Sequence, residues 1–244
     1  MADLRDVLAS PESKAPYVRR LFHTIAGRYD LITVLLSFGR DRRWKERLAD
    51  LAQVTPGTRA LDLATGTGDI AFALARRGAA VTGLDITPRM LELARAKSQG
   101  AHPEKGDSPL FLAGDMGALP FGDGAFDVVT TGYGIRNLPR IEPALVEIRR
   151  VLRPGGRLLS LDFDRPDNRA VRAVYLSYLH VVGGALGWIL HRDPDTYRYI
   201  PASIARYPGA RAVAALLERT GFVEARVLPL LGGLMAINTA ARAD

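Results

Sequence analysis

Apolar and polar positions alternate in two different periods through the middle of this 244-residue chain. Short apolar runs with β character occupy residues 60–63, 79–85, 110–115, 126–134 and 157–164, and helical spacings of apolar residues separate most of them. This alternation predicts a parallel sheet with helices on both faces. A helix at 210–221 and two strands at 222–230 and 232–241, joined as an edge hairpin, complete a seven-stranded, mostly parallel α/β fold.

The first 52 residues precede the sheet and have a different pattern. Residues 1–20 are polar and contain two prolines, so we expect a flexible or loosely docked leader. Apolar residues recur at helical spacings over 18–52, with breaks at Gly27 and Gly39, which predicts two or three helices. We therefore expect an N-terminal helical lid over 1–52 and an α/β domain over 53–244.

A long apolar stretch follows the fifth predicted strand. Residues 170–190 contain one charged side chain, Arg172, and Gly183-Gly184 interrupts the run. Its length lies near the lower limit for a membrane-spanning helix. We expect a buried or lipid-facing lid helix, within a lid insertion at about 167–208.

Composition excludes several classes of protein and site. The chain is 48% hydrophobic and 24% charged, which is typical of a soluble globular protein, and residues 1–10 do not resemble a signal peptide, so we expect a cytoplasmic protein. It has no cysteine, so disulfides, thiolate metal sites and cysteine nucleophiles are excluded, and no metal site is expected. The net charge of +7 comes mostly from scattered arginines, which is more typical of genome composition or a solvated surface than of a nucleic-acid groove. Such a charge can also help the protein approach anionic lipid headgroups.

A glycine-rich turn, Gly66-Thr67-Gly68, lies between the first strand and the helix that follows it. Such a turn allows a ligand to approach the backbone closely. Its spacing fits the dinucleotide fingerprint, which would indicate NAD. Asp62 and Asp69 flank the turn, however, and two carboxylates suit a cationic ligand such as S-adenosylmethionine better than a pyrophosphate. The turn alone leaves both ligands open.

Acidic residues also end the next two strands. Asp85 is about twenty residues beyond the turn, where a carboxylate accepts both ribose hydroxyls of either ligand. Asp115 is placed to accept the exocyclic amine of adenine, and Met116 to pack on the ring. We expect Asp62, Asp85 and Asp115 all to face the crevice at the carboxyl ends of the strands.

Several segments resemble motifs of known enzymes. The successive motifs of class I S-adenosylmethionine-dependent methyltransferases, which are Rossmann-like, are similar to LDLATGTGD (61–69), GLD (83–85), AGDMGALPF (113–121), FDVVTTGYGIRN (126–137) and RVLRPGG (150–156). More narrowly, the family that C-methylates the ring of ubiquinone and menaquinone precursors is similar in FHTIAGRYDLITVLLSFGRDRRWK (22–45), GYGIRN (132–137) and DTYRYIPASI (195–204). The resemblance runs from about Val18 to the end and implies S-adenosyl-L-methionine as cofactor and a prenylated quinol as substrate.

The resemblance also implies residues that contact the methyl donor. These are Thr67, Asp85, Asp115 and Met116, with Gly132 near the amino-acid part of the donor and Gly66 and Gly68 in the turn. Two positions depart from the family pattern. Residues 29–33 read Tyr-Asp-Leu-Ile-Thr where the family often has Tyr-Asp-x-Met-Asn, and Asp41 replaces a frequent histidine, so the wall of the acceptor pocket is expected to differ.

Residues that follow the fourth strand suit the acceptor. Arg136 remains charged and can lower the pKa of a phenol, while Asn137 can hydrogen-bond a second ring oxygen. Tyr29 is expected to close the donor pocket from the N-terminal helices. The structural alternatives are an ion pair of Arg136 with a surface carboxylate, a helix cap at Asn137 and core packing of Tyr29.

The expected reaction is C-methylation of demethylmenaquinol by S-adenosylmethionine. C-methylation of a ubiquinone precursor, 2-methoxy-6-polyprenyl-1,4-benzoquinol, is the main alternative. Another small-molecule methyltransferase and an NAD-dependent oxidoreductase are further alternatives. A peripheral membrane contact and a homodimer remain open at this point.

Overall fold

The structure is a computed structural model that describes residues 10–100 and 108–244. Its elements in chain order are α2 (Pro11–Ile25), η1 (Ala26–Arg28), α3 (Tyr29–Leu36), α4 (Asp41–Ala52), β1 (Arg59–Leu63), α5 (Asp69–Ala75), β2 (Ala80–Asp85), α6 (Pro88–Gly100), β3 (Leu110–Ala113), β4 (Phe126–Gly132), η2 (Ile135–Asn137), α7 (Ile141–Val151), β5 (Leu152–Phe163), α8 (Arg169–His191), α9 (Asp195–Arg206), α10 (Ala210–Arg219), β6 (Phe222–Leu230), η3 (Leu231–Gly233) and β7 (Met235–Arg242).

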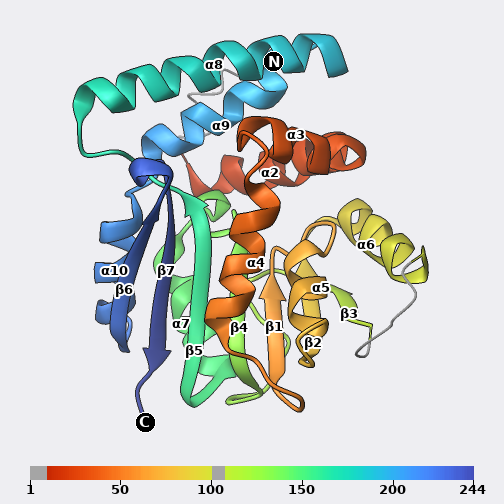
Figure 1. Cartoon of the computed structure of the whole chain (residues 1–244), viewed down its shortest axis with the longest axis vertical. Coiled ribbons are helices and arrows are strands. Elements are labelled where there is room, and N and C mark those ends of the chain that lie inside the picture. The colour runs from red at the N-terminus through yellow and green to blue at the C-terminus, as the bar shows by residue number, and fades with distance from the viewer. Residues whose placement is uncertain (1–9, 101–107) are drawn as a thin grey trace.

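Seven strands form one sheet in the order β3-β2-β1-β4-β5-β7-β6 (Figure 1). Strands β1 to β5 are parallel, and β7 is antiparallel to both of its neighbours. Leu63 pairs with Leu84 of β2 and with Thr131 of β4, so the carboxyl ends of these strands meet at one edge. The predicted seven-stranded fold and its terminal hairpin are confirmed.

Two hydrophobic layers cover the sheet. On one face, α4, α5 and α6 contribute Leu48, Leu74 and Leu91 to a cluster that includes Val128 of β4. The next residue of that strand, Val129, faces the opposite layer with α7 and α10. Because side chains alternate along a strand, the two adjacent valines of β4 supply both layers. Both faces are therefore buried, which leaves the strand ends as the place for polar chemistry.

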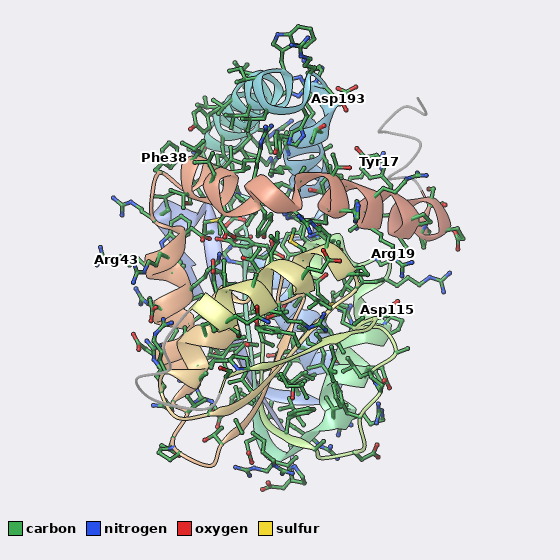
Figure 2. The ribbon with its side chains drawn as sticks, turned by 90° about the vertical axis from the view of Figure 1, so that its right-hand side faces the viewer. Tyr17, Arg19, Phe38, Arg43, Asp115 and Asp193 are labelled. Carbon is green, nitrogen blue, oxygen red and sulfur yellow. The ribbon has the colours of Figure 1, made fainter. Side chains whose placement is uncertain are left out.

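A third cluster forms a helical roof above the carboxyl ends of the strands. It joins the N-terminal helices α2 and α3 to α8 and α9, through buried side chains such as Leu21, Ile32, Leu179 and Tyr197. Figure 1 shows α8 and α9 at the top of the molecule, with α2 and α3 beside them and above the strand ends. Figure 2 shows from the side that the N-terminal helices lie between α6 and the α8–α9 pair. Two segments far apart in the sequence thus build one lid.

The expected flexible leader is wrong for residues 11–20, which belong to α2. Ser10 caps this helix by accepting a hydrogen bond from the amide of Ser13, and Pro11 occupies the first helical position. The polar appearance of the segment reflects a helix with one narrow buried stripe, which includes Val18 and Leu21. Residues 1–9 of the leader lie outside the described residues, as do residues 101–107. Strand β5 also begins earlier than expected, at Leu152.

Helix α8 occupies the apolar stretch 170–190. Within the described ranges it is the one helix long and apolar enough to cross a membrane by length and composition. Its inner face nevertheless packs on α9: a Cβ on Gly183 would lie 3.1 Å from the carbonyl oxygen of Tyr197. Such close packing against α9 ties the helix to the lid.

Candidate active site

The turn after β1 forms the floor of the site. Gly66 and Gly68 have φ angles of +56° and +89°, which residues with a Cβ adopt only at a cost. The amide of Gly66 donates a 2.9 Å hydrogen bond to Asp85 at the end of β2. The glycine conformation therefore links the turn to the neighbouring strand.

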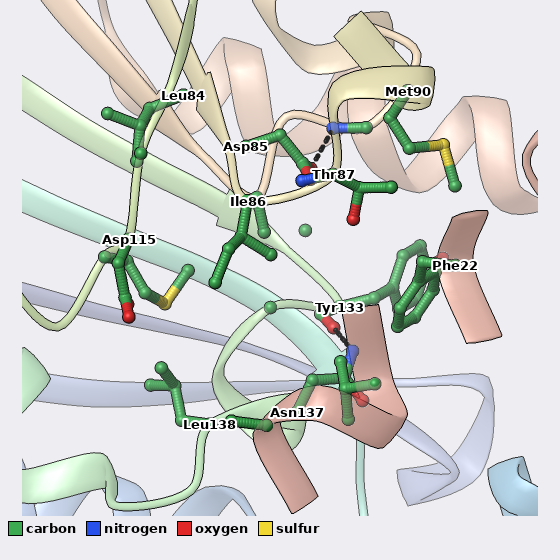
Figure 3. Close-up of a pocket in the computed structure, with 18 of the residues that line it drawn as sticks. Phe22, Leu84, Asp85, Ile86, Thr87, Met90, Asp115, Tyr133, Asn137 and Leu138 are labelled. Carbon is green, nitrogen blue, oxygen red and sulfur yellow. Dashed lines mark hydrogen bonds between the residues drawn. The ribbon is translucent and has the colours of Figure 1, made fainter. Parts of the chain in front are cut away.

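A cavity of about 800 Å³ opens at this floor. It lies between the ends of β1, β2 and β4 and the lid helix α2 (Figure 3). The residues that line it include Val18, Phe22, Tyr29, Gly66, Asp85, Ile86, Thr87, Met90, Asp115, Met116, Gly132, Tyr133, Gly134, Asn137 and Leu138. We call it the first cavity.

Asp85 is the buried carboxylate of the first cavity. One oxygen accepts the Gly66 amide and the other accepts the amide of Thr87 at 2.8 Å. Burial raises the pKa of this carboxyl group, although the hydrogen bonds from Thr87 and Gly66 oppose the shift. Each oxygen retains a lone pair for a ligand hydroxyl.

A second, more enclosed cavity of about 570 Å³ adjoins the first. Helices α2, α3 and α9 surround it with side chains that include Leu21, Ile25, Ile32, Leu36, Tyr197, Tyr199 and Ile200. Phe163 of β5 and Arg136 of η2 also line it. Three aromatic residues, Phe22, Tyr29 and Tyr133, line both cavities. The pair of cavities therefore has a shared aromatic wall, defined by these three side chains.

Arg136 is buried, with 5% of its surface exposed. Its backbone amide and its Nε donate to the two carboxylate oxygens of Asp162, at 3.0 and 3.2 Å. Its guanidinium also donates to the Ser203 hydroxyl of α9 and lies 5.1 Å from the ring centroid of Phe163. The ion-pair partner of Arg136 is thus Asp162, a buried carboxylate of β5, and not the surface carboxylate considered as an alternative. A fixed positive charge lies at the edge of the apolar second cavity.

Tyr133 of the aromatic wall is held by a buried charged pair. Its hydroxyl donates a 2.6 Å hydrogen bond to Asp41, which is paired with Lys45 at 2.6 Å. Burial raises the pKa of Tyr133, and the adjacent Asp41 carboxylate raises it further. The residue has φ of +61°, a conformation that costs a non-glycine residue energy and persists where the surroundings fix it. Asp41 therefore positions the aromatic wall through its hydrogen bond with Tyr133.

Asn137 has both side-chain groups engaged inside the protein. Its amide donates to the backbone oxygen of Tyr133 at 2.7 Å, and its oxygen accepts from the Tyr199 hydroxyl at 2.9 Å. It lines the first cavity, so the structure does not place it among the residues of the second cavity, where the predicted contact with an acceptor ring oxygen would be made. It joins η2 to α9.

The expectation that Asp62 faces the crevice is wrong. Asp62 is fully buried beneath the turn and accepts hydrogen bonds from Thr65 at 2.6 Å and Thr130 at 2.8 Å. Burial raises its pKa to about 7, and the two threonine hydroxyls oppose this shift. Asp62 stabilises the turn from below and is not among the residues that line the first cavity.

The charge argument based on Asp69 is also wrong. Asp69 pairs with Lys45 and Lys97, each at 3.0 Å, and these lysines lower its pKa against the opposing effect of burial. The carboxylate is thereby neutralised and lies outside both cavities. Thr67 belongs to the same network, because its hydroxyl donates to Asp30 at 2.6 Å and accepts from Lys97 at 2.9 Å. Neither Thr67 nor Gly68 lines the first cavity, so the structure does not bring them to the predicted donor contact.

Other lining residues have no role in the sequence-based prediction. Phe22 and Tyr133 belong to the motifs 22–45 and 132–137, but nothing in their spacing marks them as a shared wall. Ile86 and Met90 follow Asp85 closely and line the first cavity (Figure 3). The signal that could have identified them is an apolar residue just beyond the acidic residue at a strand end. Leu138 faces the same space from beyond η2.

Comparison with known proteins identifies the family. A model of the ubiE/COQ5 methyltransferase family matches residues 10–242. The chain belongs to this family. It is 44% identical over 224 residues to a demethylmenaquinone methyltransferase of Thermus thermophilus, covering 91% of this chain and all of that protein. It is 37% identical over 230 residues to the ubiquinone/menaquinone biosynthesis C-methyltransferase UbiE of Zymomonas mobilis, covering 94% of each.

Solved structures show the same fold. A possible histamine N-methyltransferase from Thermotoga maritima superposes with a TM-score of 0.65 at 18% identity, covering 92% of this chain and 99% of that one. A putative S-adenosylmethionine-dependent methyltransferase from Methanococcus maripaludis gives 0.64 at 18% identity, over 91% and 94%. This member of the ubiE/COQ5 methyltransferase family is therefore an S-adenosylmethionine-dependent enzyme with a class I fold.

The donor set of the first cavity fits the adenosine part of the cofactor. The Asp85 oxygens are placed to accept two vicinal hydroxyls, and the apolar side chains of Ile86, Met90 and Leu138 suit the faces of a flat ring. Gly66 and Gly132 line the cavity without side chains that would narrow it. These residues could therefore hold the adenosine part of the cofactor.

The raised pKa of Asp62 can be tested through the pH dependence of the free energy of unfolding. The pKa of this carboxyl group is about 7 in the folded protein, against an ordinary value of 3.8, so the folded state binds more protons than the unfolded state. Its contribution to the free energy of unfolding is therefore fully present at low pH and is lost as the pH rises from about 4 through 7. The free energy of unfolding of Asp62→Asn, measured in urea from pH 5 to 8, should therefore fall less with rising pH than that of the wild type. The difference in slope should approach at most about 1.4 kcal/mol per pH unit. Parallel plots of the free energy of unfolding against pH for the two proteins would contradict the raised pKa of the buried Asp62 carboxyl group.

The aromatic wall can be tested at Tyr133. Tyr133→Phe removes the hydroxyl and leaves the buried Asp41 carboxylate short of a donor, which costs about 1–3 kcal/mol. We expect kcat to fall about tenfold or more, because a displaced ring no longer aligns donor and acceptor where the two cavities meet, while the Kd for S-adenosylhomocysteine changes less. Steady-state kinetics and calorimetry measure both. Tyr207→Phe, at a buried tyrosine outside both cavities, is the matched control and should keep kcat; equal losses in both variants would refute a specific role of Tyr133.

Proposed function

We propose that this enzyme transfers a methyl group from S-adenosylmethionine to a ring carbon of demethylmenaquinol and so forms menaquinol. The observation that carries the proposal is the pair of adjoining cavities, one polar at Asp85 and one apolar with the charge of Arg136 at its edge. A polar methyl donor and an apolar acceptor need two neighbouring sites, one polar and one apolar. The relative in Thermus thermophilus, named for demethylmenaquinone, supports the choice of head group.

The chemistry requires an electron-rich ring carbon. A quinol acquires one when a hydroxyl loses its proton and the charge spreads to the neighbouring carbon. When bound, S-adenosylmethionine supplies an electrophilic methyl group on a good leaving group. The guanidinium of Arg136 favours the phenolate form of an acceptor in the second cavity, since a nearby positive charge lowers the pKa of a phenol.

The lid supplies orientation and exclusion of water. Lys14 of α2 donates hydrogen bonds to the backbone oxygens of Arg136 and Leu138, at 3.0 and 2.7 Å. Asp30 of α3 is paired with Lys97 at 2.7 Å. These contacts hold the N-terminal helices over the site from two sides. A closed, apolar second cavity strengthens every electrostatic interaction inside it.

The ubiquinone precursor 2-methoxy-6-polyprenyl-1,4-benzoquinol is the second candidate acceptor. The relative named UbiE in Zymomonas mobilis supports it, because that name covers both quinones. Both acceptors carry a prenyl tail and reside in the bilayer. We therefore place the enzyme on the cytoplasmic side of the membrane as a peripheral protein.

The test is a reconstituted reaction with both quinols. We expect methylated product and S-adenosylhomocysteine in equal amounts from demethylmenaquinol, with a larger kcat/KM than from the benzoquinol. Mass spectrometry of the quinone and chromatography of the nucleoside measure the two products. A larger kcat/KM for the benzoquinol would transfer the proposal to the ubiquinone precursor, and no product from either would refute it.

Arg136→Lys tests the role of the buried charge. Lysine keeps the charge but cannot reproduce the planar contacts with Asp162 and Ser203, so we expect kcat to fall about a hundredfold. Affinity for S-adenosylhomocysteine should change little, because Arg136 does not line the first cavity. Arg140→Lys, at a nearby exposed arginine, is the matched control and should keep wild-type kinetics.

A further inference from the structure

Large apolar side chains are exposed on two neighbouring lid helices. On α8, Val174 and Ile189 are each 72% exposed, Val181 is 68% and Trp188 is 63%. With the exposed apolar residues of α3 and the turn after it, they form what we call the lid surface: Leu31, Val34, Leu35, Phe38, Val171, Val174, Val181, Trp188 and Ile189. An exposed apolar patch of this kind marks a site of interaction.

The α8 part of the lid surface is one continuous helix face. Residues 171, 174, 181, 188 and 189 recur at helical spacing, so they form a stripe about 27 Å long at 1.5 Å per residue. The opposite face is buried against α9 at Gly183 and against the turn before α9 at Gly187. The helix thus presents a full apolar face outward while it remains attached to the protein.

The two helices form one surface because their aromatic residues touch. Phe38, just after α3, stacks on Tyr178 of α8 with ring centroids 5.4 Å apart. Figure 2 places Phe38 at the boundary between α3 and the α8–α9 pair. Helix α3 also lines the second cavity through Ile32 and Leu36 on its inner side. One helix therefore separates the lid surface from the cavity proposed for the acceptor.

Exposed arginines lie next to the α3 part of this surface. Helix α8 contains no aspartate or glutamate. Arg40, Arg42 and Arg43 follow Phe38 and are exposed, and none of them has an ion pair within residues 10–100 and 108–244. Figure 2 shows Arg43 on the same side of the molecule as Phe38. Apolar side chains beside unpaired arginines complement the acyl chains and anionic headgroups of a bilayer.

We propose that the lid surface is the membrane-docking face of the enzyme and that it binds anionic bilayers with α8 lying in the plane of the interface. The choice of a bilayer as occupant rests on the proposed function, because a prenylated quinol resides there. Docking in this way places α3 between the acyl chains and the second cavity. The apolar stretch of α8 then serves to attach the enzyme without crossing the membrane.

Vesicle co-sedimentation of the full-length protein tests the proposal. The wild type should bind vesicles of equal phosphatidylcholine and phosphatidylglycerol at least about tenfold more tightly than phosphatidylcholine alone. The double variant Val174→Glu/Val181→Glu should lose at least about tenfold in binding to the mixed vesicles. Arg42→Glu/Arg43→Glu should remove most of the preference for the anionic lipid. Val146→Glu makes the same change at an exposed valine of α7 and should bind as the wild type does.

Three results would overturn the docking face. The first is wild-type affinity for mixed vesicles in Val174→Glu/Val181→Glu, and the second is equal loss of binding in the Val146→Glu control. The third is a wild-type dimer in sedimentation velocity that the double variant dissociates, which would make the lid surface a contact between two copies. The activity of the double variant toward a tail-less quinol in solution separates failure of the docking proposal from failure of the proposed function. The double variant should retain that activity, since neither valine lines a cavity.

Discussion

The buried contact between Arg136 and Asp162 joins the separate parts of this enzyme. Asp162 belongs to β5 and Arg136 to η2, the guanidinium reaches Ser203 of α9, and the Arg136 carbonyl accepts from Lys14 of α2. Sheet, site loop and both lid segments therefore meet at one charged side chain. Removal of one partner of such a pair leaves an uncompensated buried charge, at a cost of about 3–5 kcal/mol. The same charge is the one available at the edge of the second cavity.

The lid explains why an enzyme of this fold needs two helical segments outside the sheet. Neither α2–α3 nor α8–α9 has a complete core alone, because their buried residues form one joint cluster. The inner sides of α2, α3 and α9 line the second cavity, and α8 backs α9. Access of a ligand to this cavity therefore depends on how the two segments separate.

Local patterns were enough to predict the sheet, because each strand and its following helix carry their own periodicity and turn residues. They also predicted that Gly66, Asp85, Asp115 and Met116 would come together, since residues at the ends of neighbouring parallel strands share one edge. Long-range ion pairs were beyond such patterns. Lys45 of α4 and Lys97 of α6 neutralise Asp69 across more than twenty residues of sequence, and Thr130 of β4 holds Asp62 below the turn. No local signal distinguishes these acids from Asp85.

We propose that donor and acceptor occupy two adjoining cavities that meet at the wall residues Phe22, Tyr29 and Tyr133, where the methyl group passes from one to the other. A crystal structure with S-adenosylhomocysteine and a tail-less 1,4-naphthoquinol tests it most directly. The account predicts the ribose on Asp85 in the first cavity and the quinol ring in the second, with an oxygen facing Arg136. Both ligands on the Asp85 side of the wall, or a quinol ring bound away from Arg136, would contradict it.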